Sequence, residues 1–245
     1  SRERRVWKAL GGGMRTELSA RSRALGDAPA AVLALERLLP PGHQGRAWEL
    51  VYSLAAHGAN LFTMLQLADG VAPTLLVVKD HTGAVFGGFA EGAWRRSGDR
   101  YYGEAGTFVF RLLPGGAGAQ GFHWRGKNRY FMLCNQEGLA LGGGGHFALF
   151  LDPDFYHGSS GACTTFESPP LCGEEAGSPS PPSHPPRPPV PPGAAAPPGS
   201  AAAGGGGGGD SRAFTCQEVE LWAVRPATAP PLASRIRDRA HSFGN

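Results

Sequence analysis

One low-complexity stretch, residues 173–212, constrains the fold of this 245-residue chain more than any other feature. The stretch is rich in Pro and then in Gly, and such a composition buries too little apolar surface to offset the entropy lost on ordering it. The sequence that follows, Phe214–Val224, alternates like a strand, with an apolar face formed by Val219, Leu221 and Ala223. We therefore expect a disordered Pro/Gly-rich insertion inside a single domain, with the strand after it returning to the same sheet.

Net charge is distributed unevenly along the chain. The whole sequence carries +3, residues 1–23 carry +5, residues 225–245 carry +3 and the insertion carries −1, so the remaining part carries −4. We expect a flexible basic extension over residues 1–23, a domain over residues 24–224 and a basic tail over residues 225–245. A nucleic-acid-binding face needs clustered Lys and Arg on the fold itself, so we expect no nucleic-acid partner.

The four cysteines are Cys134, Cys163, Cys172 and Cys216, and none forms a CxxC pair. No apolar run reaches the roughly 18 residues that a transmembrane helix needs, and no signal-peptide pattern is present in the sequence. We therefore expect a cytoplasmic protein with reduced thiols and no transmembrane segment.

Local patterns predict several short strands and a few helices. Helices are expected from Asp27, with Pro29 in the first turn, and from Asn60 as an N-cap. The expected strands are Trp48–Leu54, Leu75–Lys79, Ala84–Ala90, Thr107–Leu113, Arg129–Cys134 and Phe147–Leu151. Asp80 and Gly83 suit the turn of a hairpin between the second and third of these strands.

Three predictions concern side-chain burial. In the first expected strand, Trp48, Leu50 and Tyr52 alternate with Glu49, Val51 and Ser53 and should share one face. Later in the chain, Trp222 and Phe147 should lie in the core.

Residues 139–171 contain four consecutive glycines, Gly142, Gly143, Gly144 and Gly145. A phosphate-binding loop needs Gly-Lys-Ser/Thr and a helix after the glycines, whereas a strand is expected here. We therefore interpret these glycines as structural, for tight packing or for positive φ. Gly87 and Gly88, inside an expected strand, indicate a bulge or a close backbone approach.

The same region also contains the residue types of a catalytic site and of a metal site. Cys163 and His157, with Asp152 or Asp154, hold the residue types of a nucleophile, a base and an orienting group, but sequence spacing does not show that they meet. A zinc site from Cys134, His146, Cys163 and Cys172 lacks the short paired spacings of a tetrahedral site. We expect no metal and no cofactor.

The order of several motifs resembles the TLDc domain family. The matching segments run over residues 27–224 apart from the insertion, and they are Trp48–Ser53, Thr74–Asp80 with Gly83, Val85–Phe89, Trp94, Tyr101–Gly103, Phe108–Phe110, Trp124–Tyr130, Leu141–Leu149, Leu151–Ser160, Thr164–Phe166, Pro169–Leu171 and Val219–Trp222. The resemblance implies an α+β fold, a two-layer antiparallel β-sandwich flanked by short helices. It also implies a non-enzymatic role, with no catalytic residues to carry over.

One motif departs from the family pattern. Before its Phe-x-Phe strand the family reads Tyr-Gly-x-Gly-Glu, whereas this chain has Glu104 two residues early and Gly106 at the position of the glutamate. The role of that carboxylate is therefore open in this chain.

The resemblance implies a protein-binding module that protects against oxidative stress and binds peripheral subunits of the vacuolar-type proton pump, at endolysosomal or vacuolar membranes. The loop after Leu151 is the candidate interaction site, with Asp152, Asp154, His157, Gly158, Ser159 and Ser160. Two alternatives stay open. One is a thiol-based antioxidant or hydrolytic enzyme that uses Cys163 and His157, or Cys134. The other is a scaffold whose Pro-rich insertion docks an SH3 or WW-type module.

Overall fold

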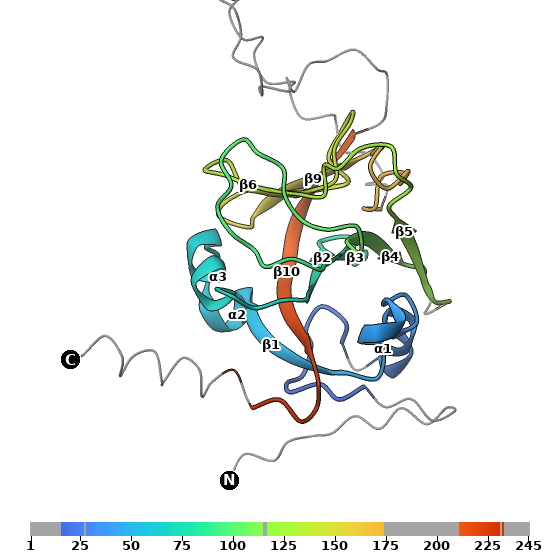
Figure 1. Ribbon diagram of the computed structural model, residues 1–245, viewed down its shortest axis with the longest axis vertical. Coiled ribbons are helices and arrows are strands. Elements are labelled where there is room, and N and C mark those ends of the chain that lie inside the picture. Colours follow the sequence, from blue (N-terminus) through green and yellow to red (C-terminus); the bar gives the residue numbers. More distant parts are fainter. Residues whose placement is uncertain (1–15, 27, 115–116, 174–210, 231, 233–245) are drawn as a thin grey trace, which may run out of the picture.

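The computed structural model describes residues 16–26, 28–114, 117–173, 211–230 and 232. Its strands form two antiparallel sheets that share the long last strand, β10 (Ser211–Arg225), which crosses the middle of the molecule in Figure 1. The predicted return of a strand after the insertion is confirmed. The strand begins at Ser211, so the last two residues assigned to the insertion belong to it, and residues 174–210, with the predicted SH3 or WW-type site, lie outside the described residues.

The first sheet has the order β5-β4-β3-β2-β10-β1 and the second has the order β10-β9-β8-β7-β6. The strands of the first sheet are β1 (Ala47–Ser53), β2 (Thr74–Asp80), β3 (Val85–Ala90), β4 (Phe108–Leu112) and β5 (Ala119–His123). Those of the second are β6 (Met132–Cys134), β7 (Leu139–Leu141), β8 (Leu149–Leu151) and β9 (His157–Gly161). The predicted α+β sandwich is confirmed, although β5, β7 and β9 were not predicted.

The main core lies between the two sheets. Val219, Leu221 and Ala223 of β10 point into it, as their alternation predicted. The sheets approach closely at Gly88 of β3, where an added Cβ would overlap the Leu141 side chain of β7. A side chain at the neighbouring Gly87 would overlap the carbonyl of Leu76 on β2. Both glycines therefore lie where the backbone leaves no room for a side chain.

A second core covers the outer face of the first sheet. Trp48, Trp222 and Phe110 project from the sheet into it, and the segment 16–26 and helix α1 (Pro29–Glu36) cover them. Residues 16–23 were assigned to a flexible extension, and the structure corrects this part of the assignment, because Leu18 is buried and the segment follows the edge of β1. Residues 1–15 lie outside the described residues.

Glu220 of β10 explains why the segment 16–26 stays on the sheet. Its buried carboxylate accepts hydrogen bonds from the Ser22 hydroxyl at 2.6 Å, from the backbone N–H groups of Arg23 and Ala24 at 2.6 and 3.3 Å, and from the Trp222 indole N–H at 3.0 Å. A buried carboxylate with four donors is well satisfied, whereas the segment has no regular secondary structure to hold it.

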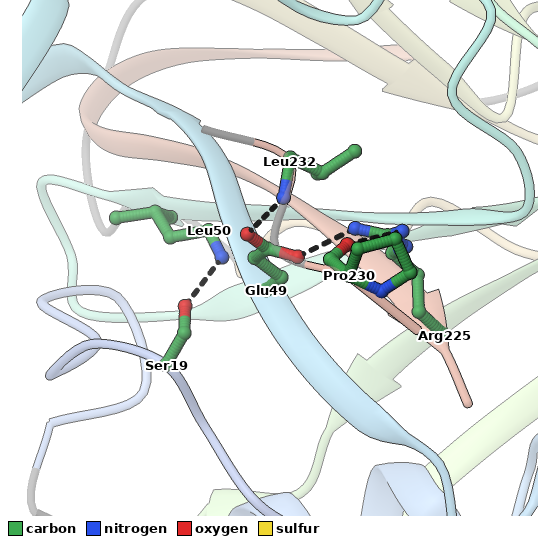
Figure 2. A network of polar contacts seen from close by, with 6 residues as sticks. All are labelled: Ser19, Glu49, Leu50, Arg225, Pro230 and Leu232. Carbon is green, nitrogen blue, oxygen red and sulfur yellow. Dashed lines mark hydrogen bonds and ion pairs between the residues drawn. The ribbon is translucent and has the colours of Figure 1, made fainter. Parts of the chain in front are cut away.

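The chain after β10 is also held in place. Figure 2 shows Glu49 of β1 accepting hydrogen bonds from the guanidinium of Arg225 and from the backbone N–H of Leu232, both at 2.7 Å. Arg225 also donates to the carbonyl of Pro230 at 2.8 Å. The predicted basic tail therefore begins inside a strand, with its first arginine ion-paired. Residues 233–245 lie outside the described residues.

The short helices follow their predicted signals in part. Helix α3 (Leu61–Leu67) begins after Asn60, whose side chain accepts from the N–H of Thr63 at 3.0 Å, as predicted. Helix α1 has Pro29 in its first turn, but its N-cap is Ala28, and Asp27 lies outside the described residues. The remaining helices are α2 (Leu54–His57) and the 3₁₀ turn η1 (Pro41–His43). No helix in the described part of the chain is long and apolar enough to cross a membrane.

Two burial predictions are wrong. The alternation of Trp48, Leu50 and Tyr52 breaks at a bulge between Leu50 and Tyr52, which sends Trp48 to the outer core and Tyr52 to the main core. Phe147 is only half-buried and stacks on Phe150, with ring centroids 5.8 Å apart, because the strand begins at Leu149 and not at Phe147.

Candidate interaction site

The predicted interaction loop is divided by the structure into an exposed turn and a buried strand. Residues 152–156 form the turn between β8 and β9, and His157 begins β9. Gly158 and Ser160 are buried and Ser159 is partly buried, because β9 is paired on both sides, with β8 and with β10. Of the six candidate residues, only Asp154 and His157 are exposed.

Asp152 fixes the backbone of this turn. Its carboxylate accepts the N–H groups of Tyr156 and His157 at 2.9 and 3.0 Å, and the His157 imidazole lies 3.5 Å from the same carboxylate. Such a ring of hydrogen bonds from one Asp to later backbone N–H groups is a common way to rigidify a turn. Asp152 therefore has a structural role, which is to fix the conformation of this turn.

The turn is also anchored to three other elements. Phe155 has a φ of 51°, is buried, and packs edge-on against Tyr52 of β1 with ring centroids 5.6 Å apart. The carbonyl of Pro153 accepts the N–H of Leu61, the first residue of α3, at 2.8 Å, and the carbonyl of Tyr156 accepts the N–H of Cys216 at 2.9 Å. A non-glycine residue at positive φ is held by its surroundings, so the turn presents a preformed surface.

The sequence analysis missed two exposed aromatic side chains, one on this turn and one on the adjoining helix α3. Tyr156 is 57% exposed and Phe62 is 53% exposed, and they are the exposed large hydrophobic residues of the described part of the chain. The bond between Leu61 and Pro153 brings the start of α3, which carries Phe62, against the turn that carries Tyr156. Exposed aromatic residues on a rigid support are typical of protein-binding sites.

Three of the four consecutive glycines pack closely against side chains. A Cβ on Gly142 would lie 2.5 Å from the Cys163 sulfur, one on Gly143 would lie 2.8 Å from the Tyr101 hydroxyl, and one on Gly144 would lie 2.7 Å from the Asn128 amide. Gly142 and Gly144 also have φ of 79°. The chain then continues into β8 and not into a helix. The glycines therefore form a connection that leads into a strand, and not a phosphate-binding loop.

The candidate catalytic residues lie at opposite ends of β9. His157 is its first residue and contacts Asp152 and Tyr156, whereas Cys163 follows its last residue and is buried, with its thiol donating to the carbonyl of Gly143 at 3.4 Å. A strand rises about 3.3 Å per residue, so roughly 13 Å of extended chain separates the two ends. The structure does not bring Cys163 and His157 together.

The other thiols also lie in apolar surroundings. Burial raises the pKa of Cys134 to about 11 and the pKa of Cys216 to about 12. Both thiols are therefore protonated at neutral pH, which disfavours nucleophilic attack. Among the described residues, no three His, Cys, Asp or Glu side chains are grouped as metal ligands, so the zinc set of Cys134, His146, Cys163 and Cys172 does not converge.

The displaced glutamate motif has a structural counterpart. The carboxylate of Glu91, just after β3, accepts the backbone N–H of Gly106 at 2.9 Å, and a Cβ on Gly106 would overlap that carboxylate. Glu104 is exposed. The space that a side chain at position 106 would enter is thus filled by the carboxylate of Glu91.

Comparison with known proteins relates this chain to one domain family and to two named proteins. The model of the TLDc domain family matches residues 28–225. Oxidation resistance protein 1 from Bos taurus and from Homo sapiens is 40% identical over 149 residues, which is 60% of this chain and 17% of that protein. Nuclear receptor coactivator 7 from Gallus gallus is 41% identical over 143 residues, which is 58% of this chain and 15% of that protein. The chain thus matches less than a fifth of the length of these relatives.

Proposed function

Because this chain belongs to the TLDc domain family, we propose that it is a non-enzymatic protein-binding module that acts in protection against oxidative stress. The name oxidation resistance protein 1, borne by its relatives, supports the protective role. The separation of Cys163 from His157 and the raised pKa of Cys134 support binding over thiol chemistry.

The partner that we propose is the peripheral sector of the vacuolar-type proton pump. This choice is supported by the family resemblance of the motifs, and it places the protein at the cytoplasmic face of endolysosomal or vacuolar membranes. The proposed contact surface is the β8–β9 turn with the start of α3. The single observation that carries this surface is the exposure of Tyr156, on a turn whose backbone is fixed by Asp152, and of Phe62, on the helix that is hydrogen-bonded to this turn.

A pull-down with the immobilised chain and the purified peripheral sector tests the proposal. The wild-type chain should recover pump subunits, and a Phe62→Ser, Tyr156→Ser variant should recover several-fold less, because exposed aromatic anchors supply much of the binding energy of such interfaces. Gln120→Ser is the control. Gln120 is exposed on β5, an edge strand of the first sheet that is not part of the proposed contact surface, so its replacement should not affect recovery.

Two results would contradict the proposal in different ways. If the folded wild-type chain recovers no pump subunit, the partner is wrong. If the aromatic variant recovers as much as the wild type, the partner stands and the contact surface is wrong.

A further inference from the structure

Cations are concentrated in two short segments of the domain. Outside the insertion, residues 24–224 contain ten Lys and Arg and fourteen Asp and Glu. Six of the ten cations lie within residues 95–100 and 125–129, where Asp99 is the one acidic residue. The six are exposed, and they are Arg95, Arg96, Arg100, Arg125, Lys127 and Arg129.

The structure places these two segments side by side. Tyr102, after the first segment, pairs with Met132 through two backbone hydrogen bonds of 2.9 Å. The rings of Tyr101 and Tyr130 contact each other with centroids 4.5 Å apart, and the N–H of Ser97 donates to the carbonyl of Cys134 at 2.8 Å. In Figure 1 the long green connection between β3 and β4 reaches the end of the molecule that holds β6. We call the six exposed cations, with Tyr101 and Tyr130 between the segments, the basic surface.

Two arginines of the basic surface are pre-positioned on aromatic rings. The guanidinium of Arg95 lies 4.5 Å from the centre of the Tyr102 ring, and that of Arg96 lies 5.5 Å from the centre of the Phe62 ring. Stacking holds the guanidinium plane while its edge can still donate to an oxygen ligand. Less conformational entropy is then lost when a carboxylate binds.

The basic surface already binds one carboxylate of the domain. Lys127 and Glu167 form an ion pair of 2.7 Å, with both side chains about half exposed. Within the two segments, the other five cations are accompanied by one acidic residue, Asp99. Elsewhere in the described part of the chain, eight cations lie among thirteen acidic residues. Four of these acidic residues, Glu36, Asp80, Glu218 and Glu220, are buried, so the rest of the surface is close to neutral.

We propose that the basic surface binds an acidic, extended segment of a protein partner through the carboxylates of its Asp and Glu side chains. This inference rests on the proposed protein-binding function and specifies the chemistry of the partner. A short acidic segment fits one local cluster of cations. A nucleic acid or an anionic membrane carries negative charge over a larger area, and the nearly neutral remainder of the domain surface would add no attraction for it. Guanidinium groups held as planar forks also match carboxylates in geometry.

The test is a fluorescence-anisotropy titration of the full chain with a fluorescein-labelled poly-glutamate peptide. The peptide should bind, and its affinity should fall with added salt. Arg96→Glu with Arg100→Glu should weaken binding about tenfold or more, and so should Arg125→Glu with Arg129→Glu, because each pair reverses several ion contacts. The melting temperatures should stay unchanged, since all four residues are exposed.

Arg37→Glu with Lys79→Glu is the matched control. It changes the net charge by the same amount outside the basic surface, so the affinity should change by no more than about twofold after screening. The inference is overturned if the peptide does not bind, if the control weakens binding as much as the surface variants, or if an oligo-dT strand or phosphatidylserine vesicles bind as tightly as the peptide. The titration contains no pump subunit, so its failure is distinct from failure of the pull-down.

Discussion

The hydroxyl of Ser22 donates a 2.6 Å hydrogen bond to the carboxylate of Glu220, across 198 positions of sequence. Through this bond the first described segment of the chain lies against its last strand. The same carboxylate also accepts from Arg23, Ala24 and Trp222, so one side chain holds together the cover of the outer core.

Replacing Glu220 with alanine should destabilise the domain strongly. The substitution leaves buried donors on Ser22, Ala24 and Trp222 without an acceptor, and such losses cost about 3 kcal/mol in total. Ser22→Ala removes one donor and should cost about 1 kcal/mol. Urea unfolding measures both, and proteolysis should cut the segment 16–26 faster in the Glu220 variant. Equal stabilities of the two variants would contradict the assigned role of Glu220.

Trp222 and Phe147 were both expected in the core, but only Trp222 is fully buried. Trp222→Ala should lower the free energy of unfolding by about 3–5 kcal/mol, since the indole is fully buried in the outer core. Phe147→Ala should cost only about 1 kcal/mol, because the ring is half-buried beside Phe150. Thermal and urea unfolding compare them, and a cost at Phe147 as large as at Trp222 would show that this ring belongs to the core.

Glu91 and Gly106 should behave as a coupled pair. Gly106→Ala pushes the Glu91 carboxylate away and loses its hydrogen bond, at a cost of about 1 kcal/mol. In a Glu91→Ser background the same substitution should cost less, so a double-mutant cycle should give a coupling of about 1 kcal/mol. Gly42→Ala is the control, since a Cβ there meets no neighbouring atom. Simple additivity at positions 91 and 106 would show that the carboxylate does not depend on this glycine.

Glu218 should make stability depend on pH. Burial raises the pKa of Glu218 above its ordinary value of 4.5, with Glu220 adding to the effect. The folded chain then holds this proton more tightly than the unfolded chain, so the free energy of unfolding falls as pH rises from 4.5 through the raised pKa. Glu218→Gln should remove this fall, while the exposed Glu104→Gln should not. Urea unfolding over a pH series measures it, and parallel curves for wild type and Glu218→Gln would contradict it.

The four thiols should be slow to react in the folded protein. All are buried, and burial raises the pKa of Cys134 to about 11 and of Cys216 to about 12. Labelling by a disulfide reagent at neutral pH should be slower than for a free thiol by on the order of a hundredfold, and unfolding should expose all four. Fast labelling of Cys163 in the native state, with peroxide consumption that is lost in Cys163→Ser, would instead favour a thiol-based enzyme.

Local sequence patterns predicted the elements whose signals are contained in a few neighbouring residues. The Asn60 cap and the turn at Asp80 were both found, and Asp80 accepts the N–H groups of Thr82 and Ala84 at 2.9 Å. β9 was missed because Gly158 and its serines have low strand propensity. In the fold, Gly158 is required there, since the Phe214 ring and the Phe150 carbonyl fill the space of a side chain.

Net charge along the sequence also gave an incomplete picture. The domain is acidic as a whole, and from this we expected no cluster of Lys and Arg on the fold. The pairing of Tyr102 with Met132 brings two cationic segments together and forms one. An average over a chain does not record which segments the topology makes neighbours.

The sequence alone indicated the family through the order of its motifs, and that resemblance implied the type of fold. It also predicted the return of the last strand after the insertion, because alternation is a property of adjacent residues. Only the tertiary structure decided that Glu220 holds Ser22, that Glu91 fills the space beside Gly106, and that Tyr156 on the β8–β9 turn and Phe62 on α3 are exposed. These relationships join residues distant in sequence, and they arise when two sheets close around one core through the strand that they share.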